Sequence, residues 1–136
     1  MRGILVALGL AVAAGCSSTP PKAGEGGVPT NADALNEVAT LLRSYPAKGG
    51  KGPAKAADLA PYEQGGPLGF AAVKKGDIVV VWGAAMGGEG DAGSADVIAY
   101  EKKTPTDGGA VLLLNGQVKA MTAAEFAAAP KAGGKK

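Results

Sequence analysis

The chain has 136 residues, of which 46% are apolar and only 4% aromatic, and this length allows one small domain at most. Its 14 Lys and Arg are interspersed with 12 Asp and Glu, so nucleic acid is not expected as a partner. There is no His, and the single Cys is Cys16. These counts exclude a Cys/His zinc site, a Ser-His-Asp triad, a Cys-His dyad and an internal disulfide.

The first segment has the pattern of a secretory signal. Arg2 is followed by an apolar run over residues 4–14. A helix of that length rises only about 16 Å, which is too short for a permanent membrane span. The run ends at Ala13-Ala14-Gly15-Cys16, which resembles the bacterial lipobox, where small residues precede a Cys that is acylated and becomes the mature N-terminus. The alternative is an ordinary secretory signal that leaves Cys16 as a spare thiol.

The resemblance to bacterial lipoproteins implies a signal peptide over residues 1–15 and a Cys16 that carries a diacylglyceryl group and an N-acyl chain such as palmitate. Each buried methylene of such chains contributes about 0.8 kcal/mol, so the anchor would be permanent. Ser17 follows the Cys, and the sorting rules of enterobacterial lipoproteins then imply the outer membrane. The predicted location is the cell envelope, lipid-anchored, at the outer membrane.

A tether, a domain and a tail are predicted after the signal peptide. Residues 16–30 comprise Cys16 and a segment rich in Pro and Gly that cannot bury enough apolar surface to fold. Such a tether spans roughly 20 Å. A small domain is predicted for residues 31–129, and a disordered tail for residues 130–136.

The domain is predicted to begin with a helix. Thr30 and Asp33 are typical capping residues, and apolar residues repeat at helical spacing from Leu35 to Tyr45. We expect this stripe to pack on the core, and a partner helix is the alternative. Residues 48–53 predict a mobile loop, and residues 53–62 predict a short helical piece.

Strands are predicted from Gly69 onward, where apolar residues alternate or form short runs. Residues 70–74 and 77–82 flank a Lys75-Gly76 hairpin turn, and the second run is apolar enough for a central strand. Residues 96–101 predict a third strand. The last two strands, residues 110–114 and 117–121, are joined by Asn115-Gly116.

A capping box from Thr122 to Glu125 opens a final short helix. The predicted fold class is therefore α+β: an N-terminal helix packed on a small antiparallel sheet of about five strands, with a short C-terminal helix.

The C-terminal part of the chain resembles a known family. The sequence GGAVLLLNGQV at residues 108–118 follows YEKKTP and precedes MTAAEF. This is similar to the C-terminal strand-turn-strand of pseudopilin-like proteins, which are abundant in planctomycete genomes. The prepilin cleavage signature is missing from the sequence, so we expect a pseudopilin-like head on a lipid anchor rather than a fibre subunit.

One acidic, Gly-rich loop is a candidate ligand site. Residues 88–93 match G-x-G-x-x-G, but Glu89 and Asp91 would repel a phosphate, and the many Gly residues make a chance match common. Glu89, Asp91 and Asp96 offer oxygen ligands for weak Ca²⁺ binding, although their spacing fits neither the EF-hand nor the RTX pattern. We interpret the segment as a solvated loop and predict no metal and no cofactor.

No catalytic residue is identified, because the chain has no His and its only thiol would be lipidated. We therefore do not expect an enzyme. The predicted function is a structural or protein-interaction module of the cell envelope, with the membrane and an envelope protein as partners. The alternative is a small-ligand or glycan-binding lipoprotein, for which Trp82 and Tyr100 would form an aromatic shelf unless they pack in the core.

Overall fold

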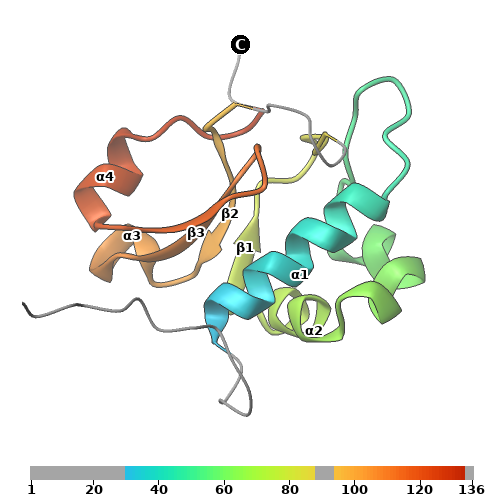
Figure 1. Ribbon diagram of the computed structural model, residues 1–136, viewed down its shortest axis with the longest axis horizontal. Helices are drawn as coiled ribbons and strands as arrows, with labels where there is room; N and C mark the ends of the chain where they lie inside the picture. The colour runs from blue at the N-terminus through green and yellow to red at the C-terminus, as the bar shows by residue number, and fades with distance from the viewer. Residues whose placement is uncertain (1–29, 88–93, 134–136) are drawn as a thin grey trace, which may run out of the picture.

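The computed structural model describes residues 30–87 and 94–133, and within them the chain forms an α+β fold with one antiparallel sheet (Figure 1). The predicted signal peptide, most of the predicted tether and the end of the tail lie outside the described residues. The strands are β1 (Ile78–Val80), β2 (Val97–Glu101), β3 (Gly109–Leu113) and β4 (Val118–Met121), and they lie in the order β1-β2-β3-β4. The helices are α1 (Asn31–Ser44), the 3₁₀ helix η1 (Ala56–Gly65), α2 (Pro67–Lys75), α3 (Thr104–Asp107) and α4 (Ala123–Ala128).

The described sheet has four strands instead of about five, because residues 70–74 belong to α2. Pro67 at the first helical position and Gly76 after the last one are helix start and stop signals. Gly76 has a φ of 81°, and the Asp77 N–H donates to the Ala72 carbonyl at 3.0 Å. The prediction of a hairpin at Lys75-Gly76 was therefore wrong, since this pair closes a helix.

The prediction of a central strand at residues 77–82 was also wrong, because β1 lies at the edge of the sheet. Ile78 and Val80 are buried, and Val79 is half-buried. Val81 and Trp82 follow the strand and pack against the main core. The long apolar run thus combines a short edge strand with two residues that pack beyond its end.

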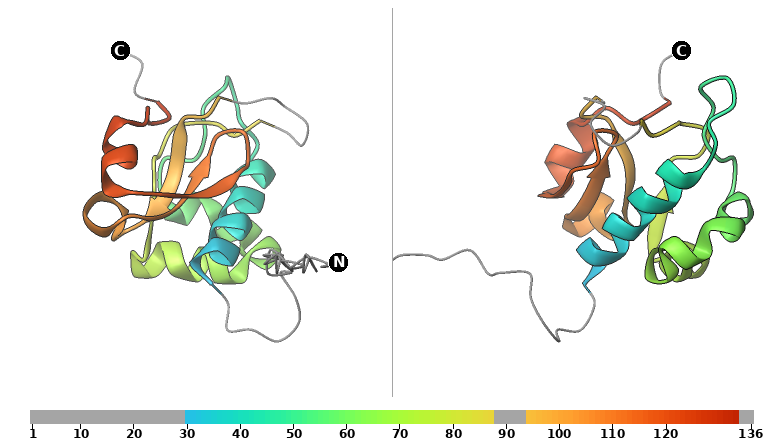
Figure 2. Two further views of the ribbon diagram at one scale, coloured as in Figure 1. Left: turned by 60° about the vertical axis from the view of Figure 1, so that its left-hand side comes forward. Right: turned by 45° about the vertical axis from the view of Figure 1, so that its right-hand side comes forward.

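Helices cover both faces of the sheet, as Figures 1 and 2 show. The main core lies between one face and the helices α1, η1 and α2, and includes Leu35, Val38, Ile98 and Leu112. The smaller core on the other face packs Phe126 of α4 against Val97, Val111, Leu113 and Met121. Because both faces are covered, β2 and the second half of β3 are buried almost throughout.

A bulge in β2 breaks the alternation of its side chains. Val97 pairs with Leu113, whereas Ala99 pairs with Leu112, so one extra residue is inserted in β2. As a result Ile98 and Ala99 both belong to the main core, although they are consecutive.

Two glycines allow α2 to approach α1 closely. A Cβ on Gly69 would lie 2.8 Å from both the Ala34 carbonyl oxygen and the Val38 nitrogen, and one on Gly66 would lie 2.9 Å from the Glu37 carbonyl oxygen. The Glu37 carboxylate accepts the Gly69 N–H at 2.9 Å. It thereby satisfies one of the free N–H groups at the start of α2.

The first residues of the predicted tail are bonded to the sheet. The Val97 N–H donates to the Pro130 carbonyl at 2.8 Å, and the Ala132 N–H donates to the Val97 carbonyl at 2.9 Å. Ala132 is buried, and the Lys131 ammonium donates to the Ala129 carbonyl at 2.7 Å. Residues 130–132 are therefore an ordered part of the domain, contrary to the prediction.

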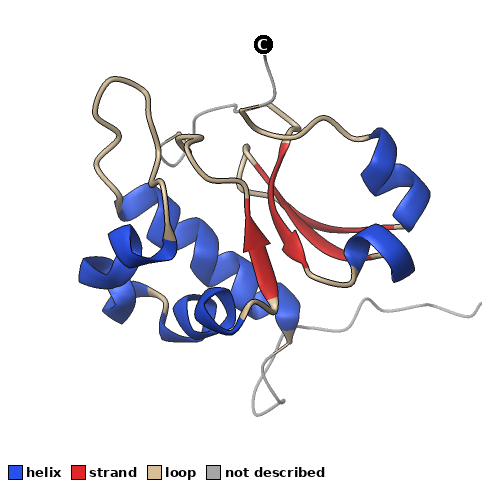
Figure 3. Ribbon diagram, turned by 180° about the vertical axis from the view of Figure 1, so that it is seen from behind, coloured by secondary structure: helices blue, strands red, loops and turns tan. Residues whose placement is uncertain are grey.

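The predicted loop at residues 48–53 is likewise bonded to another segment. Lys51 forms a bridge with Ala84, and the Gly83 N–H donates to the Pro53 carbonyl at 2.8 Å. Figure 3 shows this loop at the end of the domain where α1 ends.

The hairpin between β3 and β4 is closed by a three-residue loop. The Gly116 N–H donates to the Leu113 carbonyl at 2.8 Å, and the Leu113 N–H donates to the Gln117 carbonyl at 2.9 Å. This is the pattern of a type I turn followed by a left-handed glycine, and Gly116 has a φ of 88°. The hairpin lies where the sequence predicted it, but its loop is one residue longer than the expected two-residue turn.

We predict that Gly116→Val lowers the free energy of unfolding by about 1 to 2 kcal/mol, because a side chain there strains the positive φ. The new side chain would also meet the end of the Arg43 side chain of α1, but a flexible side chain can move aside at little cost. The matched control is Gly83→Val, at a φ of 87° with open space around it, for which we expect a similar loss. Chemical denaturation measures both values. An unchanged stability of Gly116→Val would contradict the left-handed turn at this position.

Capping boxes begin α1 and α4. The Thr30 hydroxyl and N–H each donate to Asp33 at 2.7 Å, and the Thr122 N–H donates to Glu125 at 2.8 Å. Hydrogen bonds from the Thr30 side chain, and then from its backbone, hold the pKa of Asp33 below its ordinary value of 3.8. The Thr122 backbone, and then its side chain, lower the pKa of Glu125 below 4.5.

We predict that both capping carboxylates make stability fall in acid. Because their pKa is lowered in the folded chain, their contribution is complete above the ordinary values and is lost as the pH falls through the folded ones. Denaturation midpoints at neutral pH and near pH 3 should therefore differ less in Asp33→Asn and Glu125→Gln than in the unmodified chain. Asp107→Asn, which alters an exposed carboxylate outside both boxes, should leave the difference unchanged. A full pH dependence in the capping variants would contradict this assignment.

Candidate functional site

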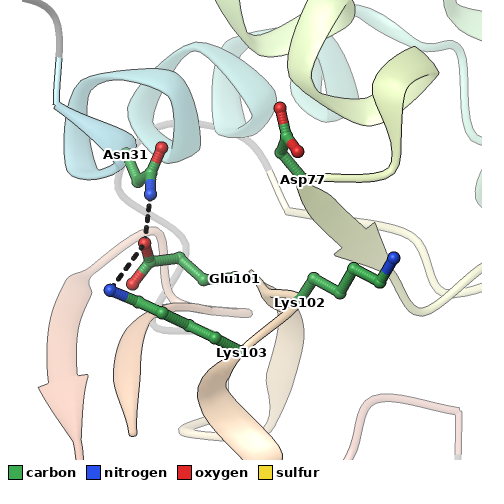
Figure 4. Close-up of a pocket in the computed structure, with 5 residues that line it drawn as sticks. All are labelled: Asn31, Asp77, Glu101, Lys102 and Lys103. Carbon is green, nitrogen blue, oxygen red and sulfur yellow. Dashed lines mark hydrogen bonds and ion pairs between the residues drawn. The ribbon is translucent and has the colours of Figure 1, made fainter. Parts of the chain in front are cut away.

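An open pocket of about 210 Å³ lies at the end of the sheet where β1 begins and β2 ends (Figure 4). Strand pairing forms this end, because the Lys102 N–H donates to the Asp77 carbonyl at 2.9 Å. The start of α1 borders it. The five residues that line the pocket are all polar: Asn31, Asp77, Glu101, Lys102 and Lys103.

Glu101 is the central group of the pocket. It is only 6% exposed, and burial of a carboxylate is costly unless donors replace the lost water. The Ala110 N–H of β3 donates to Oε2 at 2.5 Å, and the Asn31 side-chain amide of α1 donates to Oε1. The Lys103 ammonium lies 3.9 Å from Oε1. Glu101 therefore connects α1, β2 and β3.

Gly109 makes room for this carboxylate. A Cβ at Gly109 would overlap Glu101 Oε2 and would lie 2.8 Å from the Thr104 hydroxyl. Thr104 is fully buried, and its hydroxyl has no hydrogen-bond partner among the described residues. The Glu101 carboxylate and the Thr104 hydroxyl thus both lie next to Gly109.

The pocket combines charges of both signs. Figure 4 shows Asn31 and Lys103 directed toward Glu101, whereas Lys102 points away from it. Lys103 has 59% of its side chain exposed, so its ion pair with Glu101 is weak. Such a pocket can hold a small polar ligand through hydrogen bonds and charge.

Of the site residues singled out in the sequence, the structure describes only Asp96, which does not line this pocket. Cys16, Glu89 and Asp91 lie outside the described residues. Asp96 is half-buried just before β2, and its carbonyl accepts the Leu114 N–H at 2.8 Å. It therefore lies at the opposite end of β2 from Glu101. Within residues 30–87 and 94–133, no group of three or more Cys, Asp or Glu is placed to hold a metal ion.

The aromatic shelf considered for a glycan is not formed. The rings of Tyr100 and Phe126 lie 4.6 Å apart at 55°, within the smaller core. Trp82 packs against the main core. The two side chains therefore belong to opposite faces of the sheet.

The pocket was not predicted from the sequence, although the sequence contains one indication of it, the position of Glu101 in its strand. Glu101 has the same strand parity as the buried Ala99, so alternation directs its carboxylate to a covered face. A charge at an inward position of a predicted strand calls for a partner, and here the partners are Asn31 and the Ala110 N–H.

Comparison of the chain with protein-family models, with curated proteins and with solved structures finds no match. The helices in the described part of the chain are too short or too polar to cross a membrane.

We predict that Glu101 and Asn31 are energetically coupled. Glu101→Gln removes a charged acceptor from a buried site and should lower the free energy of unfolding by about 1 to 3 kcal/mol. In a double-mutant cycle with Asn31→Ala, the coupling energy should be about 1 kcal/mol. Lys103→Ala is the control and should change stability by less than about 0.5 kcal/mol. Strict additivity of the two changes would show that the amide does not hold the carboxylate.

Proposed function

We propose that this protein is a lipid-anchored, non-enzymatic interaction module of the bacterial cell envelope. The observation that carries the proposal is the tetrapeptide Ala13-Ala14-Gly15-Cys16 at the end of an apolar run. A sole Cys at this position has a chemical reason to be there, because its thiol is the group that the lipid modification uses. Ser17 supports the outer membrane as the destination.

The start of the domain supports this organisation. The capping box at Thr30 and Asp33 opens α1 where the predicted tether ends. Thr30 is exposed, so the chain can leave the domain there without disturbing the core. A lipid on Cys16 would then hold the folded domain at a short distance from the membrane.

The arrangement of the domain supports a pseudopilin-like head. The buried residues of α1 share the main core with Ile98 of β2 and Leu112 of β3. The helix thus lies against an antiparallel meander, as the resemblance of residues 108–118 implies. A head of this kind would act by binding another envelope protein, which is the partner that we propose.

Small-ligand binding is a second candidate function, and the pocket at Glu101 favours it. A buried carboxylate with an exposed Asp77 beside it suits a small ligand that carries an ammonium or hydroxyl groups. A ligand that binds there would raise the melting temperature of the protein.

We predict that the protein recovered from bacterial membranes begins at Cys16 and carries a diacylglyceryl thioether and an N-acyl chain. Intact-mass spectrometry and incorporation of labelled palmitate measure this directly. The matched control, Cys16→Ser, keeps the apolar run but has no thiol, so it should take up no label. An intact Met1, or an unmodified Cys16 in soluble protein, would overturn the anchor. If the anchor is present, affinity capture from detergent-solubilised envelopes should recover a stoichiometric protein partner.

A further inference from the structure

The pocket at Glu101 offers hydrogen-bond acceptors from three different segments of the chain. Glu101 is only 6% exposed, and its carboxylate accepts from the Asn31 side chain and the Ala110 N–H. A carboxylate has about four acceptor positions, so it can accept a further hydrogen bond. Among the described residues, neither the Asn31 side-chain carbonyl nor the exposed Asp77 carboxylate accepts a hydrogen bond. An ammonium group, which carries three donors and no acceptor, suits this set.

The same pocket also offers positive charge, because Lys102 and Lys103 line it beside the acceptors. In the described part of the chain, the one ion pair is that of Lys103 with Glu101, at 3.9 Å, so Lys102 keeps its ammonium for another partner. In the view of Figure 4, Asn31 and Glu101 lie on one side of the opening, and Asp77 and Lys102 lie on the other. The Lys102 side chain is exposed and flexible, so its ammonium can turn toward a carboxylate at the pocket.

Charge and size limit the class of ligand that fits. Two carboxylates and two ammonium groups line the pocket, so their charges cancel. A purely cationic or anionic ligand would be attracted by one pair and repelled by the other, whereas a zwitterion can place each end beside the opposite charge. The pocket volume of about 210 Å³ lies below the ~300–1,000 Å³ that is typical of pockets for drug-sized ligands. The ligand is therefore expected to be a small zwitterion.

We propose that the pocket binds a small amino acid in its zwitterionic form; this inference rests on the small-ligand binding given above as the second candidate function. The ammonium of the amino acid lies between the carboxylates of Glu101 and Asp77 and the side-chain carbonyl of Asn31. The carboxylate of the amino acid meets the Lys102 ammonium at the rim. Because Asp77 and Lys102 are exposed, water weakens both contacts, and we expect a dissociation constant on the order of 1 mM.

Three ligands of nearly equal size test which ends of the amino acid are recognised. Alanine carries both charges, alaninamide keeps the ammonium but has no carboxylate, and lactate keeps the carboxylate but has a hydroxyl in place of the ammonium. Each is titrated at neutral pH into the isotope-labelled full chain in detergent, and the backbone N–H signals of Asp77, Lys102 and Ala110 are followed by NMR. Alanine should shift these signals saturably, and alaninamide and lactate should each bind at least roughly fivefold more weakly.

Two variants that each remove one charge assign the ends of the amino acid to the pocket. Asp77→Asn should weaken the binding of alanine and of alaninamide roughly fivefold, because both ligands carry the ammonium. Lys102→Gln should weaken alanine by a similar factor but leave alaninamide unchanged. The matched controls Asp107→Asn and Lys119→Gln alter exposed residues that do not line the pocket, so they should leave both affinities unchanged. Equal effects of the pocket variants and the controls would overturn the inference.

The titrations separate this inference from the function on which it rests. If alaninamide or lactate binds as tightly as alanine, recognition of a zwitterion is wrong, but small-ligand binding at the pocket stands. If none of the three ligands gives a saturable shift, both the inference and the second candidate function are overturned. Neither result bears on the lipid anchor at Cys16, which is measured separately by the mass of the protein.

Discussion

A carboxylate that folding removes from water needs donors, and Glu101 finds them on two other elements. The Asn31 amide comes from the start of α1, and the Ala110 N–H comes from β3. Because these donors must converge on one buried group, the first turn of α1 is fixed relative to the centre of the sheet. The pocket and the place where the chain enters the domain follow from this constraint, and Gly109 leaves the space that it requires.

A chain with few aromatic residues reaches this arrangement through small residues and close backbones. Gly66 and Gly69 let α2 lie directly against α1, and Glu37 then caps α2 from the neighbouring helix. The two helices form one layer whose apolar side chains fill the main core. The opposite face of the sheet needs only Phe126 and a few aliphatic residues, since α4 is short.

The sequence predicted those elements whose signals are local. The caps at Thr30 and Thr122 and the hairpin at Gly116 depend on neighbouring residues, so their positions could be predicted. Residues 70–74 were misassigned because an apolar run bounded by Gly fits a strand as well as a helix, and the choice depends on the close approach of α1. The pocket could not be predicted from local patterns, since Asn31 and Glu101 are 70 residues apart in sequence. The one indication of the pocket in the strand pattern was a charged residue, Glu101, at an inward position.

The attachments at the two ends of β2 determine how the domain would respond to mechanical load. The entering chain is held near the end of β2 by Asn31 and Glu101, and the leaving chain is held at its start, where Val97 bonds to Pro130 and Ala132. A pull between the start of α1 and residues 130–132 would therefore act along the axis of β2. Load in that direction shears many strand hydrogen bonds together instead of opening them one at a time. The domain is thus arranged to resist unfolding when it is pulled at the two ends of its described chain.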